Sequence, residues 1–149
     1  MGWLDALRGV TVAVDSAPFI YLIEKHPVYF ATVSAFFAAV QNGEIRCVTS
    51  TLTIAEVLVH PFRLGRMDLV LDYQDILNET PDIEAFAVTS DIAEAAARLR
   101  ANFNLRTPDA IQIATALVSQ ASLFLTNDKK LTKVPGLNAL TIADVLASP

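Results

Sequence analysis

Four acidic residues stand where a carboxylate could take part in chemistry. Asp15 directly follows an apolar, β-branched run, and Asp128 follows a second apolar run. Glu56 stands within an otherwise largely apolar stretch, and Asp109 follows Thr-Pro. Acids gathered at one point repel one another unless a cation intervenes. Because ligand sets made only of oxygen favour hard cations, these residues indicate a Mg²⁺ or Mn²⁺ site if the fold brings them together.

Such a site has a characteristic chemistry. Mg²⁺ held by a few carboxylates keeps water ligands and open positions, which suits a phosphate substrate. A metal-bound water is more acidic and can attack phosphorus, while the metal stabilises charge on the phosphate and the leaving group. The expected reaction is therefore hydrolysis of phosphodiesters by metal-activated water.

The elements that must position these acids follow from the hydrophobic pattern. Short β-branched runs alternate with segments whose apolar residues recur at helical spacing, which predicts one α/β domain over residues 1–149 with a mainly parallel sheet. The predicted strands are Val10–Val14, Ile45–Thr49, Ile83–Val88, Leu123–Leu125 and Ala139–Thr141. The predicted helices are Pro18–Lys25, Val28–Gln41, Leu52–Val59, Met67–Glu79, Asp91–Asn102, Thr107–Gln120 and Ala143–Leu146.

Local signals set the expected ends of these helices. Thr107 is predicted to cap its helix, with Pro108 at the first helical position. Asp91 and Glu94, three residues apart, predict a capping box. Pro61 is expected beyond the end of its helix.

The four acids are expected to meet at one edge of the sheet. Asp15 and Asp128 follow strands, and parallel strands end at a common edge. Asp109 opens a helix that runs antiparallel to the strands, so that its start lies at the same edge. Glu56 lies on a helix leaving a strand and is expected to point inward or into the cleft. Active sites of open α/β sheets form at this edge.

Each acid also has a simpler interpretation. Asp109 would stabilise the dipole of its helix, and Asp128 would serve as a turn residue. Asp15 would cap the following helix, and Glu56 would be a solvated helix residue. Coincidence of all four at one edge is less plausible than any one of these interpretations.

The acids also stand in ordered segments that resemble the motifs of PIN domains. In that family an acid and a hydroxyl residue follow the first strand, and a glutamate lies on a later helix. The resembling segments are Val-Ala-Val-Asp15-Ser16-Ala-Pro-Phe-Ile, Ser50-Thr-Leu-Thr-Ile-Ala-Glu56-Val-Leu, Thr107-Pro-Asp109-Ala-Ile-Gln-Ile-Ala-Thr-Ala and Leu-Thr126-Asn127-Asp128-Lys-Lys-Leu.

The resemblance implies a three-layer α/β/α fold with a five-stranded parallel sheet in the order 3-2-1-4-5. It also implies a Mg²⁺- or Mn²⁺-dependent ribonuclease in which the four acids ligate or orient the metal ions. Ser16 and Thr126 would occupy the hydroxyl positions that support the site. The short chain is similar to VapC-type toxins of type II toxin–antitoxin pairs, which implies a homodimer and a small antitoxin partner. Two alternatives stay open: a nuclease outside such systems, or a non-catalytic interaction module on the same scaffold.

Composition limits the classes of partner. The net charge of −5 and the isoelectric point near 4.8 argue against a general basic nucleic-acid binder, so a bound metal would have to supply positive charge. A second set of features bears on location. No apolar run approaches the roughly 18–20 residues of a membrane-spanning helix. The amino-terminal segment lacks the features of a secretory signal peptide. The single cysteine, Cys47, is expected to be buried, and a cytoplasmic location with no membrane association fits these features.

Two rival enzyme classes place an aspartate after the first strand. Aspartyl-phosphate phosphatases need a second aspartate two residues on, where this chain has Ala17. Phospho-acceptor receiver domains need an acidic pair, where this chain has Asp15 followed by Ser16. Lys129 and Lys130 could contact a substrate phosphate, although a charged pair is more often a solvated surface.

Overall fold

A five-stranded parallel sheet organises the computed structural model, which describes residues 2–148. The strand order is β3-β2-β1-β4-β5, and every pair of neighbours is parallel. This confirms the predicted fold class and strand order. The strands are β1 Thr11–Val14, β2 Arg46–Ser50, β3 Ile83–Phe86, β4 Leu123–Thr126 and β5 Ala139–Thr141.

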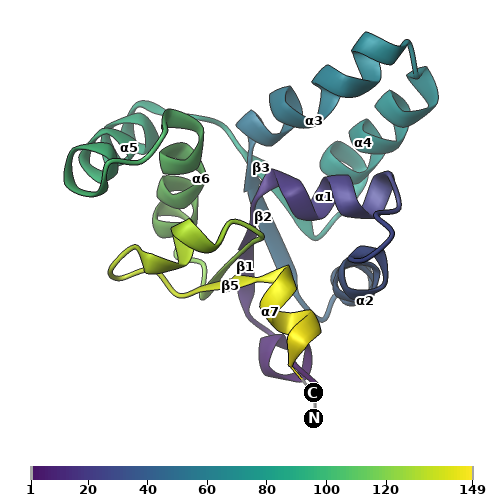
Figure 1. The fold of residues 1–149 in the computed structure, drawn as a ribbon, viewed down its shortest axis with the longest axis horizontal. Coiled ribbons are helices and arrows are strands. Elements are labelled where there is room, and N and C mark those ends of the chain that lie inside the picture. Colours follow the sequence, from purple (N-terminus) through teal and green to yellow (C-terminus); the bar gives the residue numbers. More distant parts are fainter. Residues whose placement is uncertain (1, 149) are drawn as a thin grey trace.

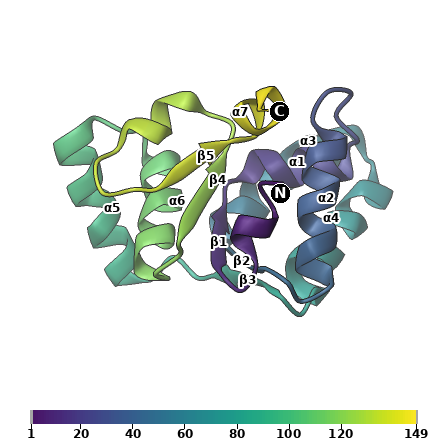
Figure 2. The same cartoon turned by 90° about the horizontal axis from the view of Figure 1, so that it is seen from below.

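Helices cover both faces of the sheet (Figure 1). One face carries α5 and α6, and the other carries α1, α2, α3 and α4, an arrangement that also shows in the perpendicular view of Figure 2. The α-helices are α1 Ser16–Ile23, α2 Phe30–Gln41, α3 Thr51–Leu64, α4 Met67–Glu79, α5 Ser90–Phe103, α6 Thr107–Val118 and α7 Ile142–Ala147. Two 3₁₀ turns, η1 Asp5–Leu7 and η2 Lys129–Lys133, were too short for the pattern to predict.

The central strand shows why the chain folds this way. Val12 and Val14 of β1 face the core shared with α1, α2, α3 and α4. Ala13, between them, faces the second core, which α5 and α6 complete. Because successive side chains of a strand point to opposite faces, this apolar run requires cover on both sides. Cys47 of β2 is fully buried, as expected.

Helix α3 runs further than the sequence pattern predicted. Pro61 was expected beyond the helix but lies inside it, where it is buried. The helix instead ends at Gly65, whose φ of +65° is left-handed. Proline cannot donate a backbone hydrogen bond, but its carbonyl still accepts one from the Arg66 amide at 2.9 Å. Late in the helix, the loss of one donor is tolerated.

Two predicted helix caps are wrong. Thr89, rather than Asp91, caps α5, because its hydroxyl accepts a hydrogen bond from the Ile92 amide at 3.3 Å. Asp91 lies one residue inside the helix, and no box with Glu94 forms at this end. In α6, Thr107 is the first helical residue and the cap position belongs to Arg106, whose side chain makes no capping bond. Within residues 2–148, no helix is long and apolar enough to cross a membrane.

Candidate functional site

Asp15 lies where the order of the strands reverses between β1 and β4. Its amide donates to the carbonyl of Leu125 at 2.9 Å, which extends the pairing of the two strands to their ends. One carboxylate oxygen accepts from the Ser16 amide at 2.8 Å, so Asp15 also caps α1. The capping interpretation is therefore correct for this residue, but it uses only one oxygen. The position is the topological switch point, where open α/β sheets bind their ligands.

Thr126 connects two of the acids. This last residue of β4 is fully buried, and its hydroxyl donates to the other oxygen of Asp15 at 2.8 Å. The same hydroxyl accepts from the Asp128 amide at 3.1 Å. One buried side chain thus fixes the orientation of Asp15 and the path of the backbone into Asp128.

The loop after β4 is held from both sides. The side-chain nitrogen Nδ2 of Asn127 donates to the hydroxyl of Tyr21 on α1 at 3.0 Å, and its side-chain oxygen Oδ1 accepts from the backbone amide of Ala143 on α7 at 3.0 Å. Asp128 accepts from the Lys130 amide at 3.0 Å and so caps η2. These bonds tie the loop to α1 and α7 and keep Asp128 at the edge of the sheet.

Asp109 lies in the first turn of α6, as predicted, and carries an ion pair. The Arg106 guanidinium contacts its two carboxylate oxygens at 3.1 and 3.4 Å. The Asp109 side chain is 16% exposed and that of Arg106 is 77% exposed. Because the arginine is largely in water, the pair contributes little to stability and can open readily.

Glu56 lies in the second turn of α3, and a buried polar network reaches it. Its carboxylate accepts from the side-chain amide of Gln112 at 3.3 Å. Gln112, which is 2% exposed, also donates to the Thr53 hydroxyl at 2.9 Å. Thr53 bonds Thr49 at 2.8 Å, and Thr49 donates to the Val14 carbonyl at 2.7 Å. The network links Glu56, which is itself exposed, to the end of the central strand.

A cleft of about 340 Å³ brings all four acids together with Ser16 and Thr126. All the residues that sequence analysis singled out for the site therefore line one surface. The cleft is lined by Asp15, Ser16, Ala17, Tyr21, Glu56, Arg106, Asp109, Thr126, Asn127, Asp128 and Lys129. Lys130 points to a neighbouring groove instead.

The cleft disfavours negative charge. Burial raises the pKa of Asp15; the hydrogen bonds from Thr126 and Ser16 oppose this shift, and the charges of Asp109 and Asp128 add to it. Burial likewise raises the pKa of Glu56; the bond from Gln112 opposes the shift, and the charges of Asp15 and Asp109 add to it. Mutual repulsion of this kind is what a cation in the cleft would relieve.

The donor set fits a hard divalent cation, since it consists of carboxylate oxygens with hydroxyls behind them. Among residues 2–148, however, no three acidic, histidine or cysteine side chains already form a metal-holding group. Protein partners hold each acid: Arg106 pairs with Asp109, and Gln112 bonds Glu56. Binding of an ion would therefore require the more exposed of these side chains to turn.

Sequence analysis missed Gln112 and Tyr21. Gln112 carried a usable signal, because it is a polar residue in a mostly apolar helix and lies three residues after Asp109, on the same helix face. Tyr21 carried none, since an aromatic residue in an apolar helix also fits a core position. Its contact with Asn127 depends on tertiary structure alone.

Comparisons place this arrangement among known proteins. No curated protein sequence matches the chain, but a family model described as PIN domain matches residues 12–137. Among solved structures, VapBC2 from Rickettsia felis bound to a promoter DNA fragment gives a TM-score of 0.68 at 16% identity, covering 88% of this chain and 98% of that chain.

Two further solved structures share the fold. A toxin–antitoxin complex from Klebsiella pneumoniae gives a TM-score of 0.66 at 22% identity, covering 88% of this chain and 97% of that chain. PAE2754 from Pyrobaculum aerophilum gives a TM-score of 0.57 at 15% identity, covering 93% of this chain and 95% of that chain. The family model matches most of the chain, and this match shows that the chain belongs to the PIN domain family.

Proposed function

We propose that the protein is a Mg²⁺- or Mn²⁺-dependent endoribonuclease whose metal is held by Asp15, Glu56, Asp109 and Asp128. The observation that carries this proposal is the single cleft lined by all four acids at the switch point of the sheet. Membership of the PIN family supports the nuclease class. RNA as the substrate rests on the resemblance of the four motifs.

The four acids would have different roles in holding the metal ion. Asp15 and Asp128, which share the Thr126 hydroxyl, form the fixed side of the site. Glu56 and Asp109 form the adjustable side, since their partners are a long amide and an exposed guanidinium. A divalent ion supplies Lewis-acid chemistry when bound, activating water and stabilising charge on the phosphate. Ser16, whose amide bonds Asp15, would keep a hydroxyl beside the site.

We further propose that the protein is the toxin of a toxin–antitoxin pair, acting as a homodimer that a small antitoxin inhibits. Two similar structures support this proposal, VapBC2 from Rickettsia felis and the toxin–antitoxin complex from Klebsiella pneumoniae. Expression of the chain alone should then arrest growth, and co-expression of the protein encoded beside it should relieve the arrest. Normal growth in cells that contain demonstrably active nuclease would point to another role.

One assay tests the nuclease proposal. The purified protein is incubated with structured and unstructured RNA, with Mg²⁺, with Mn²⁺ or with chelator. We expect cleavage that needs the metal and that Asp109→Asn abolishes. Asp91→Asn is the matched control, because Asp91 also lies in the first turn of a helix but is exposed and outside the cleft. Cleavage in chelator, or full activity of Asp109→Asn, would contradict the proposal.

A further inference from the structure

A second groove of about 570 Å³ borders the acidic cleft. Asp109 and Asp128 line both hollows, together with Arg106, so the two are continuous at the carboxylates. The remaining wall comes from the end of α5, the α5–α6 connection and η2, which contribute Phe103, Leu105 and Lys130 among others. The volume falls within the about 300–1,000 Å³ range of small-ligand sites.

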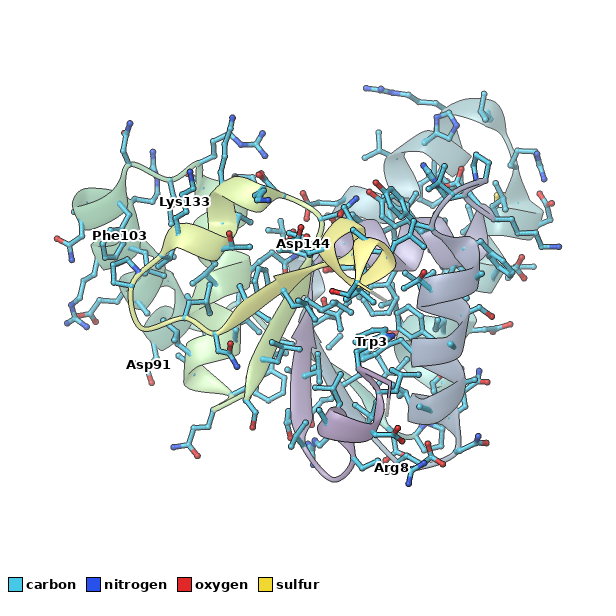
Figure 3. All side chains as sticks on the ribbon, turned by 60° about the horizontal axis from the view of Figure 1, so that its bottom comes forward. Trp3, Arg8, Asp91, Phe103, Lys133 and Asp144 are labelled. Carbon is cyan, nitrogen blue, oxygen red and sulfur yellow. The ribbon has the colours of Figure 1, made fainter. Side chains whose placement is uncertain are left out.

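The wall made by the α5–α6 connection is well ordered by its own bonds. Asn104 ends α5 with a left-handed φ of +53°, which turns the chain sharply. The Arg100 side chain donates to the Leu105 carbonyl at 3.1 Å, and the Asn104 amide donates to the Arg100 carbonyl at 3.0 Å. Phe103, on the α5 side of the molecule in Figure 3, is therefore presented from a fixed turn.

The chemistry of the groove combines an apolar surface with cations. Phe103 is 38% exposed, and Leu105, two residues later, also lines the groove. Arg106 and Lys130 bring positive charge to the same groove, and both side chains are exposed. An aromatic ring stacks on a nucleobase, and cations at its side pair with the phosphate that follows.

From these features we infer that the groove is a subsite for a nucleotide that flanks the bond to be cut. Phe103 stacks on the base, while Arg106 and Lys130 hold its phosphate. This inference rests on the proposed nuclease function, because the occupant is the continuation of a strand whose phosphate lies at the four acids. The groove is continuous with the cleft, and two cationic side chains, Arg106 and Lys130, line it beside an aromatic ring. Both features favour single-stranded RNA as the occupant.

Arg106 takes part in both sites. It contacts Asp109 in this structure, but its side chain is 77% exposed and the ion pair is worth little. Turning of Asp109 toward a metal ion would release the guanidinium for the flanking phosphate. Engagement of the acids and filling of the subsite are thereby linked.

Steady-state cleavage of a short single-stranded RNA tests the subsite in the full-length protein. Phe103→Ala should raise KM about 5- to 10-fold, the lower range for loss of one base–aromatic stack, with kcat changed less than about twofold. Lys130→Gln, which leaves the ring in place, should also raise KM and should weaken its salt dependence.

Matched controls isolate the groove. Phe62→Ala removes an aromatic ring that is 55% exposed on α3, away from the groove. Lys133→Gln removes a second exposed lysine of η2 that does not line the groove. Both controls should retain the wild-type KM.

The possible results separate the two proposals. Wild-type KM in both Phe103→Ala and Lys130→Gln, with active wild-type enzyme, would overturn the subsite and leave the nuclease standing. If Phe103→Ala and Lys130→Gln instead lose affinity for the protein encoded beside this chain and keep wild-type RNA kinetics, the groove belongs to a protein partner. That result would overturn the inference. A wild-type protein that neither binds nor cleaves RNA would remove the nuclease proposal and the subsite together.

Discussion

Thr126 holds two of the acids in place but is not itself one of the proposed metal ligands. It is fully buried, donates to Asp15 and accepts from the Asp128 amide, yet offers the ion no charge. Its position could be predicted from the motif Thr-Asn-Asp, but its bonds could not. They depend on β1 and β4 being neighbours, although 111 residues separate Thr126 from Asp15.

Thr126→Val keeps the shape of this side chain and removes both hydrogen bonds. We expect divalent-metal affinity to fall about 10- to 100-fold, the usual effect of losing a bond to a metal ligand. Stability should fall by about 1–3 kcal/mol, because the Asp128 amide loses its partner. Titration calorimetry and urea unfolding measure the two effects. Thr115→Val, which removes a buried hydroxyl bonded within α6, should lower stability without changing metal affinity.

Asp15 should make the metal-free protein less stable as pH rises. Burial raises its pKa above the ordinary 3.8, so the folded state holds the proton more tightly than the unfolded state does. The charged form therefore opposes folding, and the penalty appears as pH rises through the raised pKa. In chelator, Asp15→Asn should melt at a higher temperature than wild type at pH 7.5. The difference should shrink toward acidic pH, where both side chains are neutral.

The exposed Asp91 provides the control for this measurement, since Asp91→Asn should leave the melting temperature nearly unchanged at every pH. An Asp15→Asn protein that is less stable than wild type at pH 7.5 in chelator would show that its hydrogen bonds outweigh the cost of burying its charge. That result would contradict the account of the site as a strained acidic cluster.

At the scale of elements, α6 and α3 determine how the site is assembled. The start of α6 was predictable to within a residue from Thr-Pro-Asp, and its first turn carries Asp109 as expected. The direction of Glu56 was predicted only as inward or toward the cleft, because a helix boundary shifted by one residue rotates its side chain by about 100°. The contact that orients Glu56 comes from Gln112, which bonds both Thr53 and Glu56. It crosses between two helices, so no pattern within α3 predicts it.

Gln112→Leu tests this contact between α6 and α3. The substitution replaces the amide by an apolar group of similar size and removes the donor to Glu56, so we expect about tenfold weaker metal binding or slower cleavage. Thr53 keeps its bond to Thr49, which limits the loss of stability to about 1–2 kcal/mol. Gln74→Leu, on the exposed face of α4, is the control. Unchanged activity in a folded Gln112→Leu protein would show that Glu56 needs no positioning.

The helix ends show where local pattern reaches its limit. Thr89 and Asp91 both have capping side chains at the start of α5, and the structure selects Thr89. Pro61 was read as a terminator, but its burial against the rest of the fold keeps it within α3. In both cases the sequence offers neighbouring options for the boundary, so it places these helix ends only to within a few residues.

At the scale of the whole molecule, the alternation of strands and helices predicted a mainly parallel sheet, and the resemblance to PIN domains implied the strand order. The structure confirms both. Two-sided burial of β1 explains why the three residues before Asp15, Val12, Ala13 and Val14, are all apolar. The net charge of −5 is the physical reason why the proposed nuclease would need a bound metal ion. An acidic protein with an acidic cleft repels RNA unless a cation is bound there, so the proposed nuclease activity would require a metal ion to bind first.

Calorimetric titration of the purified protein with Mn²⁺ tests this requirement most directly. Wild type and Asp91→Asn should bind Mn²⁺ with equal heat, and Asp15→Asn should show little or none, because it lacks the carboxylate at the switch point of the sheet. Absence of heat in the wild type, or equal heat in Asp15→Asn, would contradict a metal site formed by these four acids.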